Sequence, residues 1–232
     1  MRHWVIVPAA GSGRRLGADV PKQYLSLAGR LVIEWAIEPL LGREAFAGLC
    51  VALARDDRRF AELALSRQPG IETCAGGHER SDSVWRALTA IGPRADPQEW
   101  VLVHDAARPC LERADVDTLL GALDDDPVGG LLATPLADTL KHGDSQSRSD
   151  RTVSREGLWR ALTPQAFRYG VLRQALERAR AEGAAVTDEA AAVERLGLRP
   201  MLVDGRPENL KITRPRDLEL AEAILMARHR RG

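Results

Sequence analysis

Four short runs of apolar residues recur along the chain and predict buried β-strands. They are WVIV (4–7), LCVALA (49–54), WVLVHD (100–105) and GLLATP (130–135). The intervening and following stretches have the apolar spacing or the composition of helices, over residues 30–41, 79–91, 171–196 and 215–228. Strands that alternate with helices favour an α/β fold, in which a mostly parallel, twisted sheet is covered by helices on both faces.

One polar segment interrupts this alternation. Residues 141–151, KHGDSQSRSDR, contain no large apolar side chain, whereas the sequence on both sides has a mixed, β-like pattern. The segment is either a flexible loop or the tip of a protruding β-arm whose legs are those flanks. Composition alone favours the loop, because polar, Ser-rich segments rarely form packed structure.

Length and charge narrow the class of protein. The 232 residues suit one large domain over residues 1–232, and the 33 basic and 33 acidic residues cancel. We therefore expect no nucleic-acid partner and no anionic membrane partner, so any affinity for phosphate must be local. No apolar run approaches the roughly 20 residues of a membrane span. Cys50, Cys74 and Cys110 are widely spaced and form no metal-binding pattern, which favours a soluble protein of the reducing cytoplasm.

A glycine-rich turn, PAAGSGRRLG (8–17), follows the first predicted strand. A dinucleotide fingerprint is excluded because its third glycine would come one residue too late, and a Walker A loop is excluded because the required lysine and hydroxyl are missing. Gly11 and Gly13 would let backbone amides approach a nucleotide, while Arg15 and Lys22 would neutralise a triphosphate. The alternative is a structural turn that carries surface cations.

A second glycine pair occurs in AGGHERSDS (75–83), at another change from strand to helix. Gly76 and Gly77 would let the backbone approach a base, and Ser83 would point its hydroxyl toward the cleft. A tight turn before a helix explains the same residues without any function. Arg80 is equally compatible with a phosphate contact and with a surface salt bridge.

The strand-end sequence VLVHDAARP (101–109) places ionisable residues where α/β enzymes bind ligands. Asp105 could present its carboxylate to a magnesium ion on the triphosphate, and Arg108 could meet a second anion. The alternative for Asp105 is a turn or capping acid. For His104, a hydrogen-bonded structural role is favoured over a role as a base.

Two further candidates lie late in the chain. Thr187, in TDEAAAVE (187–194), could bind a substrate phosphate or could cap the helix that follows. Lys211, in RPENLKITRP (206–215), is by default an ordinary solvated lysine.

Taken in order, PAAGSGRRLG, PKQYL, GGHERSDSV, VHDAARP, TVSREGLWRALTPQ, TDEA and GRPENLKITRP resemble the 2-C-methyl-D-erythritol 4-phosphate cytidylyltransferase family, over nearly the whole chain. The resemblance implies a nucleotidyltransferase-type α/β fold and a β-arm at about 136–159 that contacts a second subunit in a homodimer. It also implies the reaction: with Mg²⁺, CTP and methylerythritol phosphate would give the CDP-alcohol and pyrophosphate, by in-line attack of the acceptor phosphate on the α-phosphorus.

The resemblance also implies a role for each matching residue. The triphosphate would contact Arg15 and Lys22, and Asp105 would face both the magnesium ion and the acceptor. The residues expected around cytosine and ribose are Ala9, Ala10, Gly11, Gly77, His78 and Ser83. The residues expected around the methylerythritol phosphate are Thr139, Arg155, Thr163, Thr187 and Lys211, with Thr139 and Arg155 on the arm and reaching the other subunit's site.

Two other functions remain open from the sequence. A ribitol 5-phosphate cytidylyltransferase would share the nucleotide half and differ in its acceptor. A module that binds CTP without chemistry is less consistent with Arg15, Lys22 and Lys211, since three cations around one reacting phosphorus suit charge stabilisation in a transition state.

Overall fold

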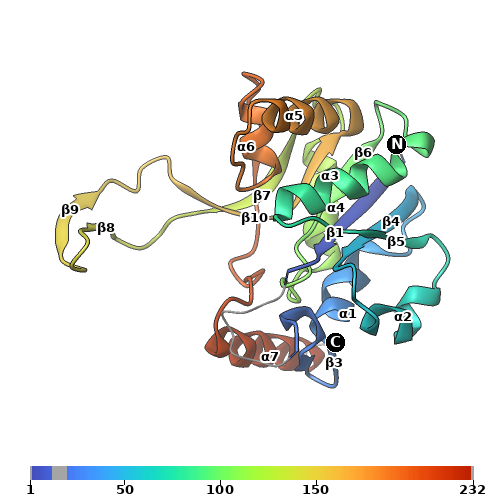
Figure 1. Ribbon diagram of the computed structural model, residues 1–232. Coiled ribbons are helices and arrows are strands. Elements are labelled where there is room, and N and C mark those ends of the chain that lie inside the picture. Colours follow the sequence, from blue (N-terminus) through green and yellow to red (C-terminus); the bar gives the residue numbers. More distant parts are fainter. Residues whose placement is uncertain (1, 12–19, 231–232) are drawn as a thin grey trace.

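The computed structural model describes residues 2–11 and 20–230, and its centre is a seven-stranded sheet (Figure 1). Strand β10 runs antiparallel to its neighbours β6 and β7, whereas the remaining adjacent pairs are parallel. In spatial order the strands are β11 (Met201–Asp204), β7 (Gly129–Pro135), β10 (Trp159–Arg168), β6 (Trp100–Val103), β1 (His3–Ala9), β4 (Phe46–Leu53) and β5 (Ile71–Ala75). The predicted mostly parallel sheet is confirmed.

Both faces of this sheet are apolar because successive residues of its central strands point to opposite sides. Val5 and Leu102 pack on one face, against α1 (Val32–Ile37) and α4 (Arg113–Ala122). Ile6 and Val103 pack on the other, against α3 (Arg80–Ile91), α5 (Tyr169–Ala181) and α6 (Glu189–Glu194). Helices therefore cover both faces, as the alternating pattern predicts.

Smaller elements complete the molecule. A third apolar cluster, which includes Leu27 and Leu225, packs α7 (Pro215–His229) beside the short hairpin of β2 (Ser26–Leu27) and β3 (Arg30–Leu31). The other short helices are α2 (Arg59–Glu62), η2 (Lys22–Tyr24), η3 (Glu38–Leu40), η4 (Ala64–Arg67) and η5 (Gly92–Arg94).

Two predicted helices differ from the observed ones. The helix expected over 30–41 is α1 followed by η3, which has proline in its first turn. The helix expected over 171–196 is two helices, α5 and α6, with Gly183 between them at φ +61°. A left-handed residue cannot continue an α-helix, so the chain turns there.

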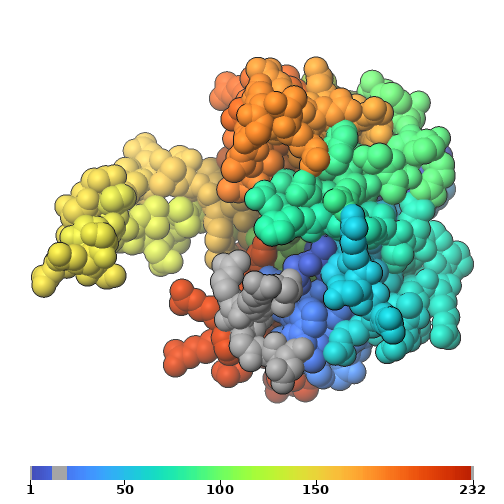
Figure 2. All heavy atoms as spheres, in the orientation of Figure 1, coloured from blue at the N-terminus to red at the C-terminus, as the bar shows by residue number. Residues whose placement is uncertain are grey.

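The polar segment after β7 is a β-arm, and the loop favoured by composition is wrong. Strands β8 (Leu140–Gly143) and β9 (Ser149–Val153) pair in an antiparallel hairpin that projects far from the sheet (Figures 1 and 2). At its tip, the Asp144 carboxylate accepts hydrogen bonds from the amides of Gln146 and Arg148, at 2.9 and 2.8 Å. The strands are mostly exposed, so they have no core to face and no apolar alternation to reveal them.

The parallel strands bring three loops to one edge of the sheet. The loops after β1, β5 and β6 all begin at carboxyl ends of strands, the edge where open α/β sheets bind ligands. These are the loops that carry the predicted nucleotide and acidic residues. Among the described residues, no helix is both long enough and apolar enough to cross a bilayer.

Leu102 tests the central packing, because it is fully buried on β6. We expect Leu102→Ala to lower the free energy of unfolding by about 2 to 5 kcal/mol, through lost burial and the cavity left behind. Urea denaturation followed by circular dichroism measures this change. The matched control is Leu220→Ala on α7, where the leucine is 54% exposed and a change within about 0.5 kcal/mol is expected. Equal losses for both variants would contradict the placement of the core.

Candidate active site

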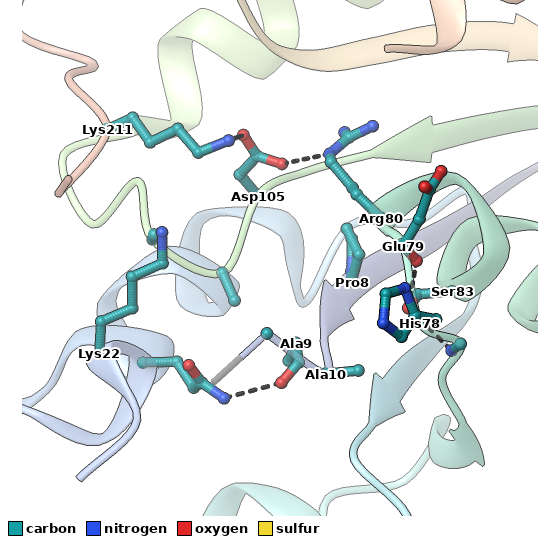
Figure 3. A pocket seen from close by; sticks show the side chains of 15 residues that line it. Pro8, Ala9, Ala10, Lys22, His78, Glu79, Arg80, Ser83, Asp105 and Lys211 are labelled. Carbon is teal, nitrogen blue, oxygen red and sulfur yellow. Dashed lines mark hydrogen bonds and ion pairs between the residues drawn. The ribbon is translucent and has the colours of Figure 1, made fainter. Parts of the chain in front are cut away.

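A cavity of about 220 Å³ opens at this edge of the sheet (Figure 3). It is bounded by the end of β1, the turn after β5, the turn after β6 and the chain just before α7. The sequence-predicted residues that line it are Ala9, Ala10, Gly11, Lys22, Gly77, His78, Ser83, Asp105 and Lys211. Residues from five separate motifs therefore meet in one place.

The carboxylate of Asp105 is the most strongly paired group in this cavity. Its Oδ1 accepts from Arg80 Nε at 2.8 Å, and its Oδ2 lies 2.8 Å from Lys211 Nζ and 3.6 Å from Arg108 Nε. Burial raises the pKa of Asp105, but the charges of Arg80, Lys211 and Arg108 outweigh burial and hold that pKa far below its ordinary range. Asp105 is therefore an ionised acceptor and not a proton donor.

Arg80 forms salt bridges, but with two buried carboxylates and not at the surface, and its phosphate contact stays a prediction. Its two terminal nitrogens donate to the Glu189 carboxylate at 2.7 and 2.9 Å, while its Nε holds Asp105. Burial lowers the pKa of Arg80, but the two carboxylates outweigh it and raise that pKa above the ordinary value. Arg80 is therefore a cationic bridge between two carboxylates. Glu189 was missed because 109 positions separate it from Arg80.

Behind Asp105, a chain of neutral hydrogen bonds fixes the turn after β6. The Asp105 amide donates to Thr163 Oγ1 at 3.2 Å, and Thr163 Oγ1 lies 2.9 Å from His104 Nδ1. His104 Nε2 lies 3.1 Å from the Arg108 carbonyl, which can only accept, so Nε2 carries the proton and Nδ1 accepts from Thr163. Burial lowers the pKa of His104 to about 4, so the ring is neutral near pH 7. The structural role expected for His104 is confirmed.

Arg108 supports the same turn from the other side. Its guanidinium is buried and donates to the Asn209 carbonyl at 2.7 Å and, more weakly, to the Ala161 carbonyl at 3.4 Å. Asn209 is itself fully buried and donates from Nδ2 to the Thr163 carbonyl at 2.6 Å. These contacts join the chain before α7 to β10, and they place Lys211 beside Asp105.

The wall of the cavity predicted to face the nucleotide, here called the nucleotide wall, is built from small residues in close contact at Ala10, Gly76 and Gly77. A Cβ added to Gly76 would lie 2.4 Å from the Cβ of Ala10, and one added to Gly77 would lie 2.1 Å from the Cβ of Asp82. Both glycines are thus required by packing. The Gly77 amide donates to the Ser83 hydroxyl at 3.0 Å, and that hydroxyl donates to the Glu79 carbonyl at 3.2 Å.

Lys22 enters the cavity from the opposite wall (Figure 3). It begins η2, and its Nζ donates to the Ile212 carbonyl at 3.3 Å. The next residue, Gln23, is buried and donates to the Ala9 carbonyl at 2.7 Å, which ties this helix to the end of β1. Gln23 is a second residue that sequence reasoning missed. Lys22 and Lys211 thus lie on the same side of the cavity, across from the nucleotide wall.

Comparison with known proteins identifies the family to which this chain belongs. The family model described as 2-C-methyl-D-erythritol 4-phosphate cytidylyltransferase matches residues 3–227. The chain belongs to this cytidylyltransferase family. The resemblance seen in the sequence motifs is therefore confirmed.

Relatives and solved structures of this cytidylyltransferase family agree with the assignment. A 2-C-methyl-D-erythritol 4-phosphate cytidylyltransferase of Pseudomonas putida is 50% identical over 217 residues, which cover 93% of this chain and 92% of the relative. A relative of Vibrio vulnificus with the same name is 47% identical over 95% of this chain and 93% of its own length. The solved cytidylyltransferase of Francisella tularensis superposes with a TM-score of 0.84 at 32% identity, covering 97% of this chain and 100% of that one.

Several residues assigned from the cytidylyltransferase family do not reach the cavity within this chain. Thr139 and Arg155 are exposed on the arm, and Thr187 is exposed before α6. The N-cap of α6 is Asp188, whose carboxylate accepts from the Ala191 amide at 2.9 Å, so the capping alternative for Thr187 is wrong. Arg108 and Thr163 are buried next to the cavity without lining it. Gly13 and Arg15 lie outside the described residues.

The neutral state of His104 predicts a loss of stability in mild acid. The pKa of His104 is about 4 in the folded chain and 6.5 in the unfolded chain. Below pH 6.5 the unfolded chain therefore binds a proton at this residue that the folded chain does not bind. Between pH 7 and pH 5 this single group should cost on the order of 2 kcal/mol of folding free energy. Burial lowers the pKa of His3 to about 4 as well, and it contributes in the same direction.

Urea denaturation of the wild type and of His104→Gln at pH 7 and pH 5 measures this effect. We expect the wild type to lose more stability than the variant over that interval, since glutamine does not titrate. The same pH dependence in both proteins would show that His104 is not held neutral by the fold.

Proposed function

We propose that this chain transfers CMP from CTP to 2-C-methyl-D-erythritol 4-phosphate, forming the CDP-alcohol and pyrophosphate. The observation that carries this proposal is the cavity itself, in which a backbone-rich wall at Ala10 and Gly77 faces Lys22 and Lys211. A neutral base suits the first wall, and the phosphates of two anionic substrates suit the second. The relatives named for this reaction support the choice of CTP and of the acceptor.

The chemistry requires positioning and charge cancellation more than proton transfer. The acceptor phosphate is already anionic near neutral pH, so in-line attack on the α-phosphorus needs no strong base and no covalent intermediate with the protein. Negative charge builds on the phosphate oxygens as the transition state forms. We assign Arg15 and Lys22 to the triphosphate and Lys211 to the acceptor phosphate, where each holds one reacting group in line.

Asp105 would face the acceptor, and it would also be the protein's contribution to a magnesium ion. Among the described residues, no cluster of three His, Cys, Asp or Glu side chains forms a metal cage. A single ionised carboxylate beside the proposed triphosphate site still fits Mg²⁺, which proteins commonly bind through one or two carboxylates and substrate phosphates. Bound there, the ion would neutralise charge on the triphosphate and help to orient it.

We propose further that the active unit is a homodimer. Thr139 and Arg155 lie on an arm that projects from the body of the molecule (Figure 2), and neither lines the cavity of its own chain, so they would serve the site of a second copy. At the root of the arm, Leu158 and Trp159 are 39% and 37% exposed, and apolar side chains of this size are typical of interfaces. The arm would then complete the partner's acceptor site.

We place the protein in the cytoplasm. Its cysteines are free thiols, and Cys50 and Cys110 are buried without a disulfide. Reduced thiols are the usual state of cysteine in that compartment.

Pyrophosphate release tests the proposed reaction. Purified protein with Mg²⁺ is offered CTP, UTP, ATP or GTP together with methylerythritol phosphate or ribitol 5-phosphate, in every pairing. We expect release with CTP and methylerythritol phosphate alone. Lys22→Ala should lower turnover by about a hundredfold or more and leave the circular dichroism spectrum unchanged, because it removes charge stabilisation from the transition state.

Each other outcome has a definite meaning. Release with ribitol phosphate in place of methylerythritol phosphate would overturn the acceptor. Binding of CTP without release in any pairing would favour a nucleotide-binding module. Normal turnover of Lys22→Ala would remove Lys22 from the mechanism.

Subunit mixing tests the shared site. Lys22→Ala and Arg155→Ala are each expected to be nearly inactive, since each loses one phosphate contact in every site. In a mixed dimer, one site combines the intact Lys22 of one subunit with the intact Arg155 of the other. After random exchange of equal amounts, about a quarter of wild-type activity should return. If activity does not return although mass spectrometry detects mixed dimers, Arg155 does not act across subunits.

A further inference from the structure

Glu189 is a buried carboxylate that does not touch the cavity. It is 1% exposed, on the first turn of α6, and it is not among the residues that line the cavity. A charge at this depth is stable only when it is paired and hydrogen-bonded. Both of its oxygens are engaged by the two terminal nitrogens of Arg80, at 2.7 and 2.9 Å. This bidentate pair fixes the plane of the guanidinium as well as its position.

The remaining donor of that guanidinium reaches the active site. Arg80 Nε lies 2.8 Å from Asp105 Oδ1 (Figure 3). One planar group therefore links the buried Glu189 to the carboxylate in the cavity. The two terminal nitrogens of an arginine form a planar fork of N–H donors, which also binds phosphate well. Because Glu189 occupies both terminal nitrogens, Arg80 cannot offer that fork to a substrate phosphate.

The start of α6 holds Glu189 in place from behind. Asp188 accepts from the Ala191 amide at 2.9 Å and from Gln165 Nε2 at 2.9 Å. Gln165, which is buried on β10, also accepts from the Ala190 amide at 2.8 Å. The carboxylate therefore belongs to a rigid helix start that is bonded to the central sheet.

We propose that Glu189 is a positioning residue for the acceptor. Because it pairs with both terminal nitrogens of Arg80, these nitrogens cannot bind the phosphates. Arg80 Nε therefore keeps the Asp105 carboxylate oriented toward the acceptor alcohol. This inference rests on the proposed function of the cavity. Loss of the Glu189 charge would free two strong donors beside two polyanionic substrates. The guanidinium would then turn toward the acceptor phosphate, and Asp105 would lose its Nε contact.

Steady-state kinetics of Glu189→Gln test this inference. The substitution keeps the shape of the side chain and removes its charge, and its amide nitrogen cannot accept from Arg80. We expect kcat/KM for methylerythritol phosphate to fall by about tenfold to a hundredfold, the range seen when a group that orients a metal ligand is lost. KM for CTP should stay within about twofold, since the nucleotide wall is untouched. The matched control is Glu194→Gln, an exposed position on the same helix, with wild-type kinetics expected.

A double-mutant cycle with Arg80→Met separates positioning from a general effect on the fold. If Glu189 acts through Arg80, then Glu189→Gln should cause no further loss of kcat/KM in the Arg80→Met background. The double variant should also unfold at a higher temperature than Arg80→Met alone, because the latter leaves Glu189 buried and unpaired. Equal losses from Glu189→Gln in both backgrounds would overturn the inference.

Two further measurements keep the outcomes distinct. Calorimetric binding of CTP shows whether Glu189→Gln is folded; if it does not bind, Glu189→Asp replaces it, which keeps the charge but withdraws it by one methylene. Wild-type acceptor kinetics in the folded variant would overturn the role of Glu189 and leave the reaction intact. If the wild type itself releases no pyrophosphate, both the reaction and this role are wrong.

Discussion

The site depends on keeping a carboxylate ionised inside the edge of the sheet. Asp105 is 6% exposed, and burial alone would favour its neutral form. Three cations reverse that preference, and each comes from a different part of the chain: Arg80 from α3, Arg108 from the turn after β6, and Lys211 from the segment before α7. Since an unpaired buried charge is costly, these elements cannot separate without a large loss of stability. The charge balance that suits catalysis is thus also a constraint on the fold.

The opposite wall of the cavity is built from small residues rather than from charged side chains. Gly76 and Ala10 are in contact, and Gly77 lies against Asp82, so backbone is presented where larger side chains would fill the space. Backbone groups are well suited to a neutral base, since their positions are set by the strands that end there. The cationic side then needs only to cancel phosphate charge. Transfer between two phosphates is mainly a matter of such positioning and electrostatics, without a dedicated proton acceptor.

The direction of each strand explains how the acceptor side is assembled. Because β10 is antiparallel to β6, Gln165 pairs with Val103, and the residues just before Gln165 lie beside those just after Val103. Thr163 therefore meets His104 at the same edge. The other neighbour of β10 is β7, whose carboxyl end lies at that edge too. The arm between β7 and β10 thus leaves the molecule beside the cavity, where it could reach a second copy.

What the sequence determined by itself is local. Apolar runs indicated the core strands because burial on both faces demands them. The small residues of the turn after the first strand predicted a nucleotide loop, because only small residues allow such close approach, and this loop stays a prediction. The amino-acid composition did not predict the arm, because strands such as β8 that face no core carry no apolar pattern. The tertiary structure decided the charge pairs. Arg80 meets Glu189 across 109 positions, and His104 meets Thr163 across 59. No local pattern encodes these contacts, because they depend on which helix starts and strand ends the packed sheet brings together.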